Sequence, residues 1–176
     1  MHDPPLFHTI MTSAGTIIDI HDDGVLATSL HVQVHGTKLL FIWPGTQCNR
    51  KFFHVSHTTE HPLRLREAIS EMGDEFKLTI LNAGTTVHLE PGRIHAVISP
   101  GNSTIACCEY VDAKMRDSAH IKEGVKWILD LIKTRRNPLP NDEDLMELYQ
   151  PLIYGMRMWE CLLQKLVEIP DETLAH

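Results

Sequence analysis

Hydrophobic positions follow two different spacings along the chain, and the change between them lies near residue 113. Before it, short runs rich in Thr, Val and Ile alternate with turn residues such as Asp23-Gly24, Pro91-Gly92 and Pro100-Gly101. This alternation is typical of strands joined by tight turns. It predicts eight strands, over residues 6–11, 15–21, 26–34, 38–43, 76–81, 85–89, 94–99 and 104–111. Eight short strands of this kind predict a mainly β fold, a barrel or a sandwich.

A longer insert, residues 44–75, separates the fourth and fifth predicted strands. Within it, residues 62–72 begin with a proline and place Leu65 and Ile69 at helical spacing, so they predict a short helix. The insert also contains three histidines, His54, His57 and His61, which are expected to lie in a solvated loop.

Beyond residue 117 the hydrophobic spacing lengthens to about 3.6 residues, the period of an α-helix. Ser118 can cap a helix that runs to residue 135, and a second helix is predicted from Asn141 or Asp142 to residue 167. We therefore expect a barrel over residues 6–112 and a C-terminal helical hairpin over residues 118–168, packed on the barrel or on a second copy. Trp127 and Trp159 are expected to be packing residues at a helix–helix or subunit contact.

Composition narrows the class of protein. The 176 residues are 43% hydrophobic, and 16 Lys+Arg against 23 Asp+Glu give a net charge of −7, which gives no support for a nucleic-acid partner. No apolar run approaches the roughly 20 residues that cross a bilayer, and no secretory signal is visible. The four cysteines show no CxxC spacing and fit reduced thiols. We expect an intracellular protein, nuclear or cytoplasmic, without a membrane segment.

The 12 histidines direct attention to metal binding. His21 and Asp23 are two residues apart at the end of the second predicted strand, so their side chains lie on one side of an extended chain. His95 follows a Pro-Gly turn at the start of the seventh predicted strand. Taken singly, each is more commonly part of a surface turn or a core. Together they form the two-His-one-carboxylate set that binds one face of Fe(II) and leaves positions open for a co-substrate and O2.

These segments resemble the JmjC branch of the cupin superfamily, Fe(II)/2-oxoglutarate-dependent oxygenases built on a double-stranded β-helix (a cupin or jelly-roll barrel). Residues 15–44, GTIIDIHDDGVLATSLHVQVHGTKLLFIWP, resemble its pattern T-D-x-H-x-D, a strand, a G-x-K turn and an apolar strand ending in proline. Residues 84–97 resemble its segment G-D-x-x-x-x-P-x-G-W-x-H-x-V, which delivers the last iron ligand. The resemblance covers most of residues 6–112 and is nearest to small fungal JmjC-like proteins.

The resemblance implies an enzyme in which His21, Asp23 and His95 hold Fe(II) and Lys38 binds the distal carboxylate of 2-oxoglutarate. It implies hydroxylation or N-demethylation of a protein or small-molecule substrate. Lys38 lies in an otherwise apolar run, which favours an inward side chain over the solvated strand edge where lysine is usually found.

Three positions depart from the family pattern. A threonine that contacts 2-oxoglutarate is replaced by Ile18, an asparagine of the last strand by Glu109, and the aromatic residue of the last-ligand turn by Arg93. Because isoleucine cannot hydrogen-bond a carboxylate, Thr28 or Thr104 is considered as the second contact to 2-oxoglutarate.

Two other functions stay open. Ile18 favours a cupin metalloenzyme that does not use 2-oxoglutarate. The missing threonine, with the short segment before the barrel, favours a degenerate binding or scaffold protein whose C-terminal helices form a homodimer. His31 and His88 are expected to lie on strand faces rather than to bind metal, and one of Cys107 and Cys108 is expected in the core.

Overall fold

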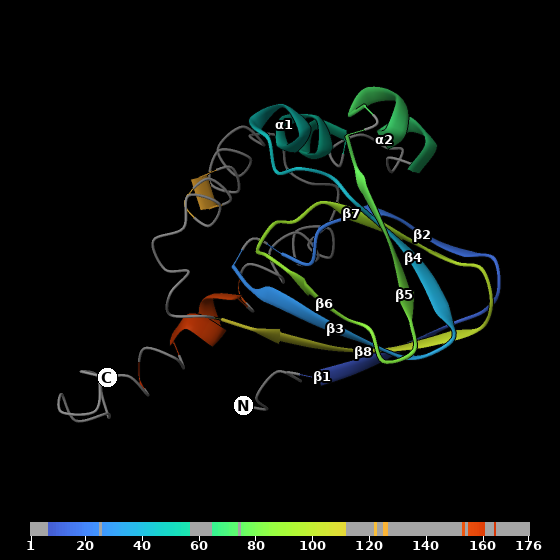
Figure 1. Cartoon of the computed structure of the whole chain (residues 1–176). Helices are drawn as coiled ribbons and strands as arrows, with labels where there is room; N and C mark the ends of the chain where they lie inside the picture. The colour runs from blue at the N-terminus through green and yellow to red at the C-terminus, as the bar shows by residue number, and fades with distance from the viewer. Residues whose placement is uncertain are drawn as a thin grey trace, which may run out of the picture.

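The computed structural model describes residues 7–24, 26–56, 65–73 and 75–111, and in the C-terminal part residues 122, 125–126, 153, 155–160 and 164. Two helices, α1 (Gln47–Ser56) and α2 (Leu65–Glu71), lie between the fourth and fifth strands of the chain. The strands are β1 (Phe7–Thr12), β2 (Thr16–His21), β3 (Thr28–His35), β4 (Thr37–Ile42), β5 (Lys77–Asn82), β6 (Thr86–Leu89), β7 (His95–Ser99) and β8 (Ser103–Tyr110) (Figure 1).

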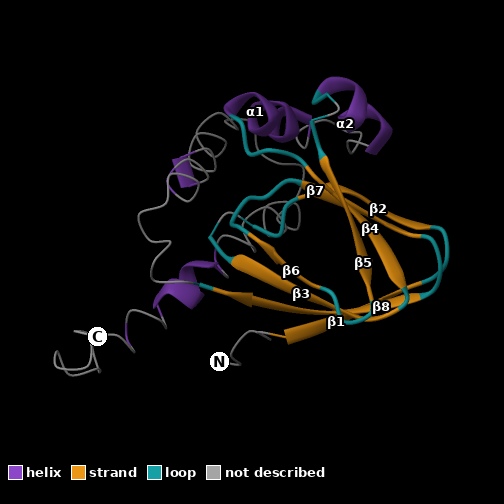
Figure 2. Ribbon diagram, in the orientation of Figure 1, coloured by secondary structure: helices purple, strands orange, loops and turns teal. Residues whose placement is uncertain are grey.

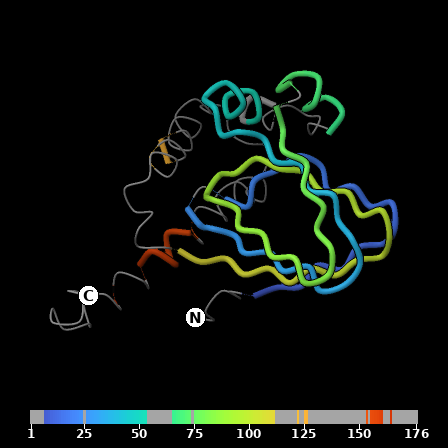
Figure 3. The backbone as a smooth tube through the Cα atoms, viewed as in Figure 1, coloured from blue at the N-terminus to red at the C-terminus, as the bar shows by residue number. Residues whose placement is uncertain are grey.

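The strands form two four-stranded antiparallel sheets, β1-β8-β3-β6 and β2-β7-β4-β5. The chain folds back on itself in nested pairs: β4 lies beside β5, β3 beside β6, β2 beside β7 and β1 beside β8. This order is that of a jelly roll, or double-stranded β-helix, and it confirms the mainly β fold predicted from the sequence. Figure 2 shows the sheets as two facing layers, with α1 and α2 at one end. Figure 3 shows β1 and β8 side by side, although they begin and end the barrel.

All eight predicted strands are confirmed to within two residues at each end, and α2 lies within the predicted helix of residues 62–72. The expectation of a loop at His54 is wrong, because this residue belongs to α1. The Thr46 hydroxyl caps the N-terminus of this helix, accepting a hydrogen bond from the Asn49 amide at 3.2 Å, and the burial of Phe53 packs the helix on the rest of the fold. His57, His61 and most of the predicted C-terminal hairpin lie outside the described residues.

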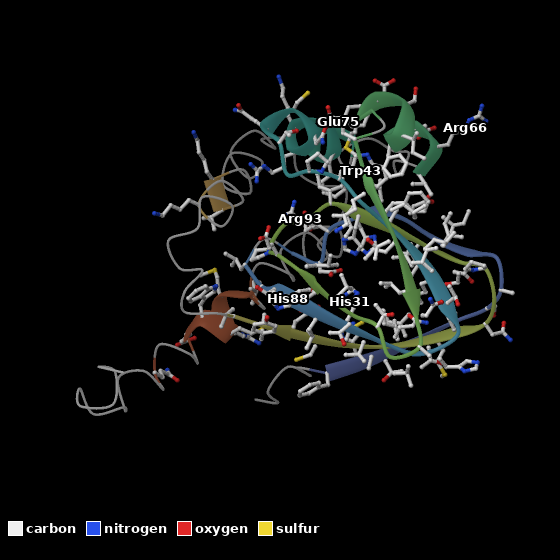
Figure 4. All side chains as sticks on the ribbon, in the orientation of Figure 1. His31, Trp43, Arg66, Glu75, His88 and Arg93 are labelled. Atoms are coloured by element: carbon white, nitrogen blue, oxygen red, sulfur yellow. The ribbon has the colours of Figure 1, made fainter. Side chains whose placement is uncertain are left out.

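Two clusters of buried side chains hold this arrangement together. Between the sheets lie Leu40, Leu81, Leu89, Val97, Ile105 and Cys107. Where α1 and α2 cover the β2-β7-β4-β5 sheet, Trp43 is fully buried with Ile20, Phe53, Leu65, Ala68, Met72, Ile94 and Ala96 (Figure 4). None of the described helices is long and apolar enough to cross a membrane.

Two glycines at turns between strands test how tightly the barrel is packed. Gly36, between β3 and β4, has a φ of 73°, and a Cβ placed on it would overlap the carbonyl oxygen of Asn102. Gly84 has a φ of 86°, but nothing lies within 4 Å of its Cβ position.

We expect Gly84→Ala to lower the free energy of unfolding by about 1 kcal/mol, the cost of a left-handed backbone. Gly36→Ala should lower it by about 3 kcal/mol, because the backbone must also shift. Urea denaturation measures both, and equal losses would contradict the packing described here.

Candidate metal centre

His21, Asp23 and His95 converge inside the barrel, and one donor atom of each lies within 4.8 Å of the other two. His21 ends β2 and His95 begins β7, and the two residues are directly paired across these strands. Asp23 lies in the loop after β2, with its Oδ1 atom 3.7 Å from the Nε2 atom of each imidazole. The structure thus brings together the three residues that the sequence analysis selected as a set.

A β-bulge turns His21 toward the interior. Ile18 of β2 is paired with Val97 and His21 with His95, so three steps along β2 match two steps along β7. In a regular strand Ile18 and His21 would face opposite sides, because side chains alternate. The extra residue changes the alternation, and both side chains line the same cavity. Ile20, between them, is buried in the cluster beneath α1 and α2.

Each imidazole is oriented by a backbone carbonyl two residues before it. His21 Nδ1 donates to the carbonyl of Asp19 at 2.8 Å, and His95 Nδ1 donates to the carbonyl of Arg93 at 2.9 Å. Because a carbonyl oxygen only accepts hydrogen bonds, Nδ1 is the protonated nitrogen in the neutral form of each ring, and the lone pair of that form is on Nε2. A hydrogen bond of this kind orients most histidines that bind metals in proteins.

The Nε2 atom of His95 shows that this donor set fits a divalent metal ion. His95 is 1% exposed, and its Nε2 is buried without a hydrogen-bond partner. Burial, and then the neighbouring His21, lower the pKa of His95 to about 4, so the ring is neutral near pH 7. A neutral imidazole with an unused lone pair is the form that coordinates a metal. A cation bound here would satisfy an acceptor whose burial otherwise costs free energy.

Asp23 is shared between the imidazole pair and a third histidine. Its Oδ2 atom lies 3.3 Å from Nε2 of His31, which belongs to β3 in the opposite sheet and lies between the sheets in Figure 4. Burial raises the pKa of Asp23, but the hydrogen bond to His31 and the other nearby imidazoles outweigh it and hold this pKa well below its usual range. Burial lowers the pKa of His31, but the contact with Asp23 has the larger, opposite effect, and the pKa rises to about 9.

His31 was expected on a strand face, and the structure shows that this face is the inner one. Along β3 the polar side chains of Ser29, His31 and Gln33 are buried while Leu30 and Val32 are only partly so, which is the reverse of what hydrophobicity alone predicts. His88 lies on the outer face of β6, where its ring stacks on Tyr110. Cys107 is buried and Cys108 is half-buried, which agrees with one core thiol.

Lys38 lies in the same cavity as the metal group. It is 1% exposed on β4, and the alternation that buries Leu40 also directs Lys38 between the sheets. Burial lowers the pKa of Lys38. Within the described part of the chain it forms no ion pair. The expectation of an inward lysine is therefore confirmed.

Neither of the threonines considered as a second contact lies on the cavity wall. Thr28 is buried at the start of β3, but it faces away from the side that carries His31, and Thr104 is likewise opposite in phase to Cys107 on β8. The described wall contains no hydroxyl side chain. The wall is formed by the metal group, His31, Lys38 and Cys107 together with His8, Ile10, Ile18, Leu40, Leu81, Val97, Ile105 and Glu109.

The loop that carries Asp23 is held by two hydrogen bonds near the metal group. The Gly24 amide donates to the Asp22 carboxylate at 3.1 Å, and the Gly92 amide donates to the Gly24 carbonyl at 2.8 Å. Burial, and then the charge of Asp23, raise the pKa of Asp22 to about 6. Because Gly92 belongs to the turn before His95, the second bond joins the segments that supply the ligands.

No protein-family model and no curated protein matches this chain. The solved structures that are similar to it include the cupin domain of Drosophila melanogaster CENP-C, with 7% identity and a TM-score of 0.40 over 60% of this chain and 56% of that one. A cupin superfamily protein of Desulfitobacterium hafniense gives 9% identity and 0.37 over 60% and 66%. Oxalate oxidase in complex with glycolate gives 12% identity and 0.38 over 58% and 40%.

The nested strand order is that of a jelly roll, and the donor group lies between its two sheets. The chain has a double-stranded β-helix fold. It covers less than two thirds of the length of each solved structure just named.

Metal binding can be measured directly with Co²⁺, whose visible absorption reports coordination. We expect the wild-type protein to bind one Co²⁺, and His95→Ala to weaken binding by about 100-fold or more because it removes the most buried donor. His88→Ala is the matched control, since this histidine lies on the outer face of β6 and should leave the titration unchanged. Equal affinities for all three proteins would contradict the assignment.

The raised pKa of His31 predicts a pH-dependent stability of the metal-free protein. Its pKa is about 9 in the fold against 6.5 ordinarily, so the stabilisation is complete below pH 6.5 and is lost as the pH rises through 9. Relative to His31→Gln, the wild-type free energy of unfolding should therefore fall by up to about 3 kcal/mol across this range. Urea denaturation over the range tests it, and a difference that stays constant with pH would overturn the ion pair.

Proposed function

We propose that this protein is an Fe(II)- and 2-oxoglutarate-dependent oxygenase of the JmjC type, acting as a hydroxylase or N-demethylase. The observation that carries the proposal is the position of Lys38, a buried lysine in the same cavity as the metal group. A buried ammonium group without an anion is costly, and a small dicarboxylic acid bound to the metal would supply that anion.

The three donors have distinct parts in holding the iron. His21 and His95 each offer an Nε2 atom, and Asp23 offers Oδ1, while its other oxygen stays with His31. All three come from β2, the loop after it and β7, so they approach from one side. Iron and 2-oxoglutarate bound there would activate O2: the co-substrate would supply two electrons and leave as succinate and CO2, with one oxygen atom entering succinate and the other the substrate C–H bond.

Lys38 binds the distal carboxylate of 2-oxoglutarate by a charge-assisted hydrogen bond. In the buried cavity this bond is stronger than in water, because the effective dielectric constant is lower. Ile18, Val97 and Leu40 form an apolar part of the cavity wall, which excludes water from the co-substrate. N-demethylation would follow when the hydroxylated carbon is an N-methyl group, so one site serves either reaction.

A cupin metalloenzyme that does not use 2-oxoglutarate is the second candidate, and two observations favour it. The described cavity wall offers no hydroxyl group to assist Lys38, since Ile18 stands where the family has threonine. Glu109 also lines the cavity, and burial, followed by the charge of Asp23, raises its pKa. A second carboxylate disfavours a ligand that carries two negative charges and favours a substrate with fewer.

An anaerobic Fe(II) titration, with and without 2-oxoglutarate, separates these candidates. We expect the weak visible charge-transfer band of the chelated co-substrate in the wild-type protein. Lys38→Met keeps the length of the side chain without its charge, so it should retain Fe(II) but require at least about 10-fold more 2-oxoglutarate for the band. His21→Ala should lose the band through loss of the iron itself.

Each other outcome has a definite meaning. Iron binding without a band in the wild-type protein would contradict the oxygenase and favour the second candidate. A band of equal midpoint in Lys38→Met would remove Lys38 from the site. A wild-type protein that binds no iron would favour a non-catalytic binding protein.

A further inference from the structure

A segment far along the chain from the barrel lies against the loop that follows Asp23. Residues 155–160 are helical, and the indole Nε1 of Trp159 donates a hydrogen bond to the Leu26 carbonyl at 2.9 Å. Met158, in the same turn, is 6% exposed. In Figure 1 this turn, coloured red, lies beside the start of β3. Trp159 was expected at a helix–helix or subunit contact; the structure shows its indole bound to the barrel of its own chain.

Gly155 shows that the fit at Leu26 is close. A Cβ placed on Gly155 would lie 2.5 Å from Cβ of Leu26 and 3.1 Å from its Cδ1, so only glycine lets the helix approach so near. Leu26 is itself 6% exposed. One loop residue is therefore bound through its carbonyl by Trp159 and enclosed at its side chain by Gly155.

Leu26 lies between two groups of the metal site. Asp23 precedes it by three residues, and β3, which carries His31, begins two residues after it. The Gly24 carbonyl of the same loop accepts the Gly92 amide from the turn before His95. The loop is thus attached at Gly24 to the segment of the last ligand and at Leu26 to the C-terminal segment.

We propose that Trp159 and Gly155 are positioning residues for the metal centre, holding the loop so that the Asp23 carboxylate stays directed at His21 and His95. The proposal rests on the metal site proposed above. Without the attachment at Leu26, the loop samples more conformations, and metal binding must offset the entropy of ordering it. Loss of outer contacts that orient a ligand typically lowers metal affinity by about 10- to 100-fold.

Co²⁺ titration of the full chain tests this. Trp159→Phe keeps an aromatic ring but removes the N–H donor, so we expect about 10-fold weaker Co²⁺ binding with little change in the Tm of the metal-free protein. Gly155→Ala should weaken binding at least as much, because Leu26 must move. Met156→Ala is the matched control from the same helix, since Met156 is 59% exposed, and it should bind like the wild-type protein.

A purely structural role would lower the Tm of the metal-free variants and leave the Co²⁺ affinity of the folded fraction unchanged, which overturns the proposal. Equal affinities of the wild-type protein and Trp159→Phe overturn it as well, and they leave the metal site intact. A wild-type protein that binds no Co²⁺ overturns the metal site and this proposal together. The comparison between wild type and variant therefore distinguishes the two failures.

Discussion

The antiparallel pairing of β2 with β7, with one extra residue in β2, is the constraint on which the rest of the site depends. It sets His21 directly opposite His95, and the bulge turns His21 and Ile18 to the same side. Asp23 then needs only a short loop to reach both imidazoles. In a regular strand either His21 or Ile18 would face away from the cavity. The bulge is therefore what allows His21 to join the other donors.

Backbone groups near this pairing fix the orientation of the two imidazoles. The carbonyls of Asp19 and Arg93 select the tautomer of each imidazole. The Asp19 carboxylate also accepts a hydrogen bond from the Leu65 amide, at the start of α2, at 3.1 Å. One residue therefore orients a ligand through its main chain and anchors the insert through its side chain, so the insert is coupled to the metal site.

The sequence was sufficient for the strands, because alternation and turn residues are local signals. His21 and Asp23 are a local pair, but His95 was joined to them only through their combined match to the family pattern. The burial of Lys38 also followed from its apolar neighbours. The inward side of β3 was not predictable in the same way, since alternation separates two faces without saying which is inner; the sequence therefore did not show that His31 faces the cavity and Thr28 does not. The α1 helix has a local signal only in the Thr46 cap and otherwise depends on packing of Phe53, and the Trp159 contact joins residues 133 positions apart, which no local pattern predicts.

The nested order of the strands has a consequence for how the protein reaches its native state. The pairs are all between strands distant in sequence, and topologies dominated by such pairings fold slowly. The His-x-Asp pair is local, but His95 meets it only when β7 pairs with β2. A chain in which these two strands have not paired therefore carries two of the donors without the third, so binding by the complete set reports that this part of the roll has formed.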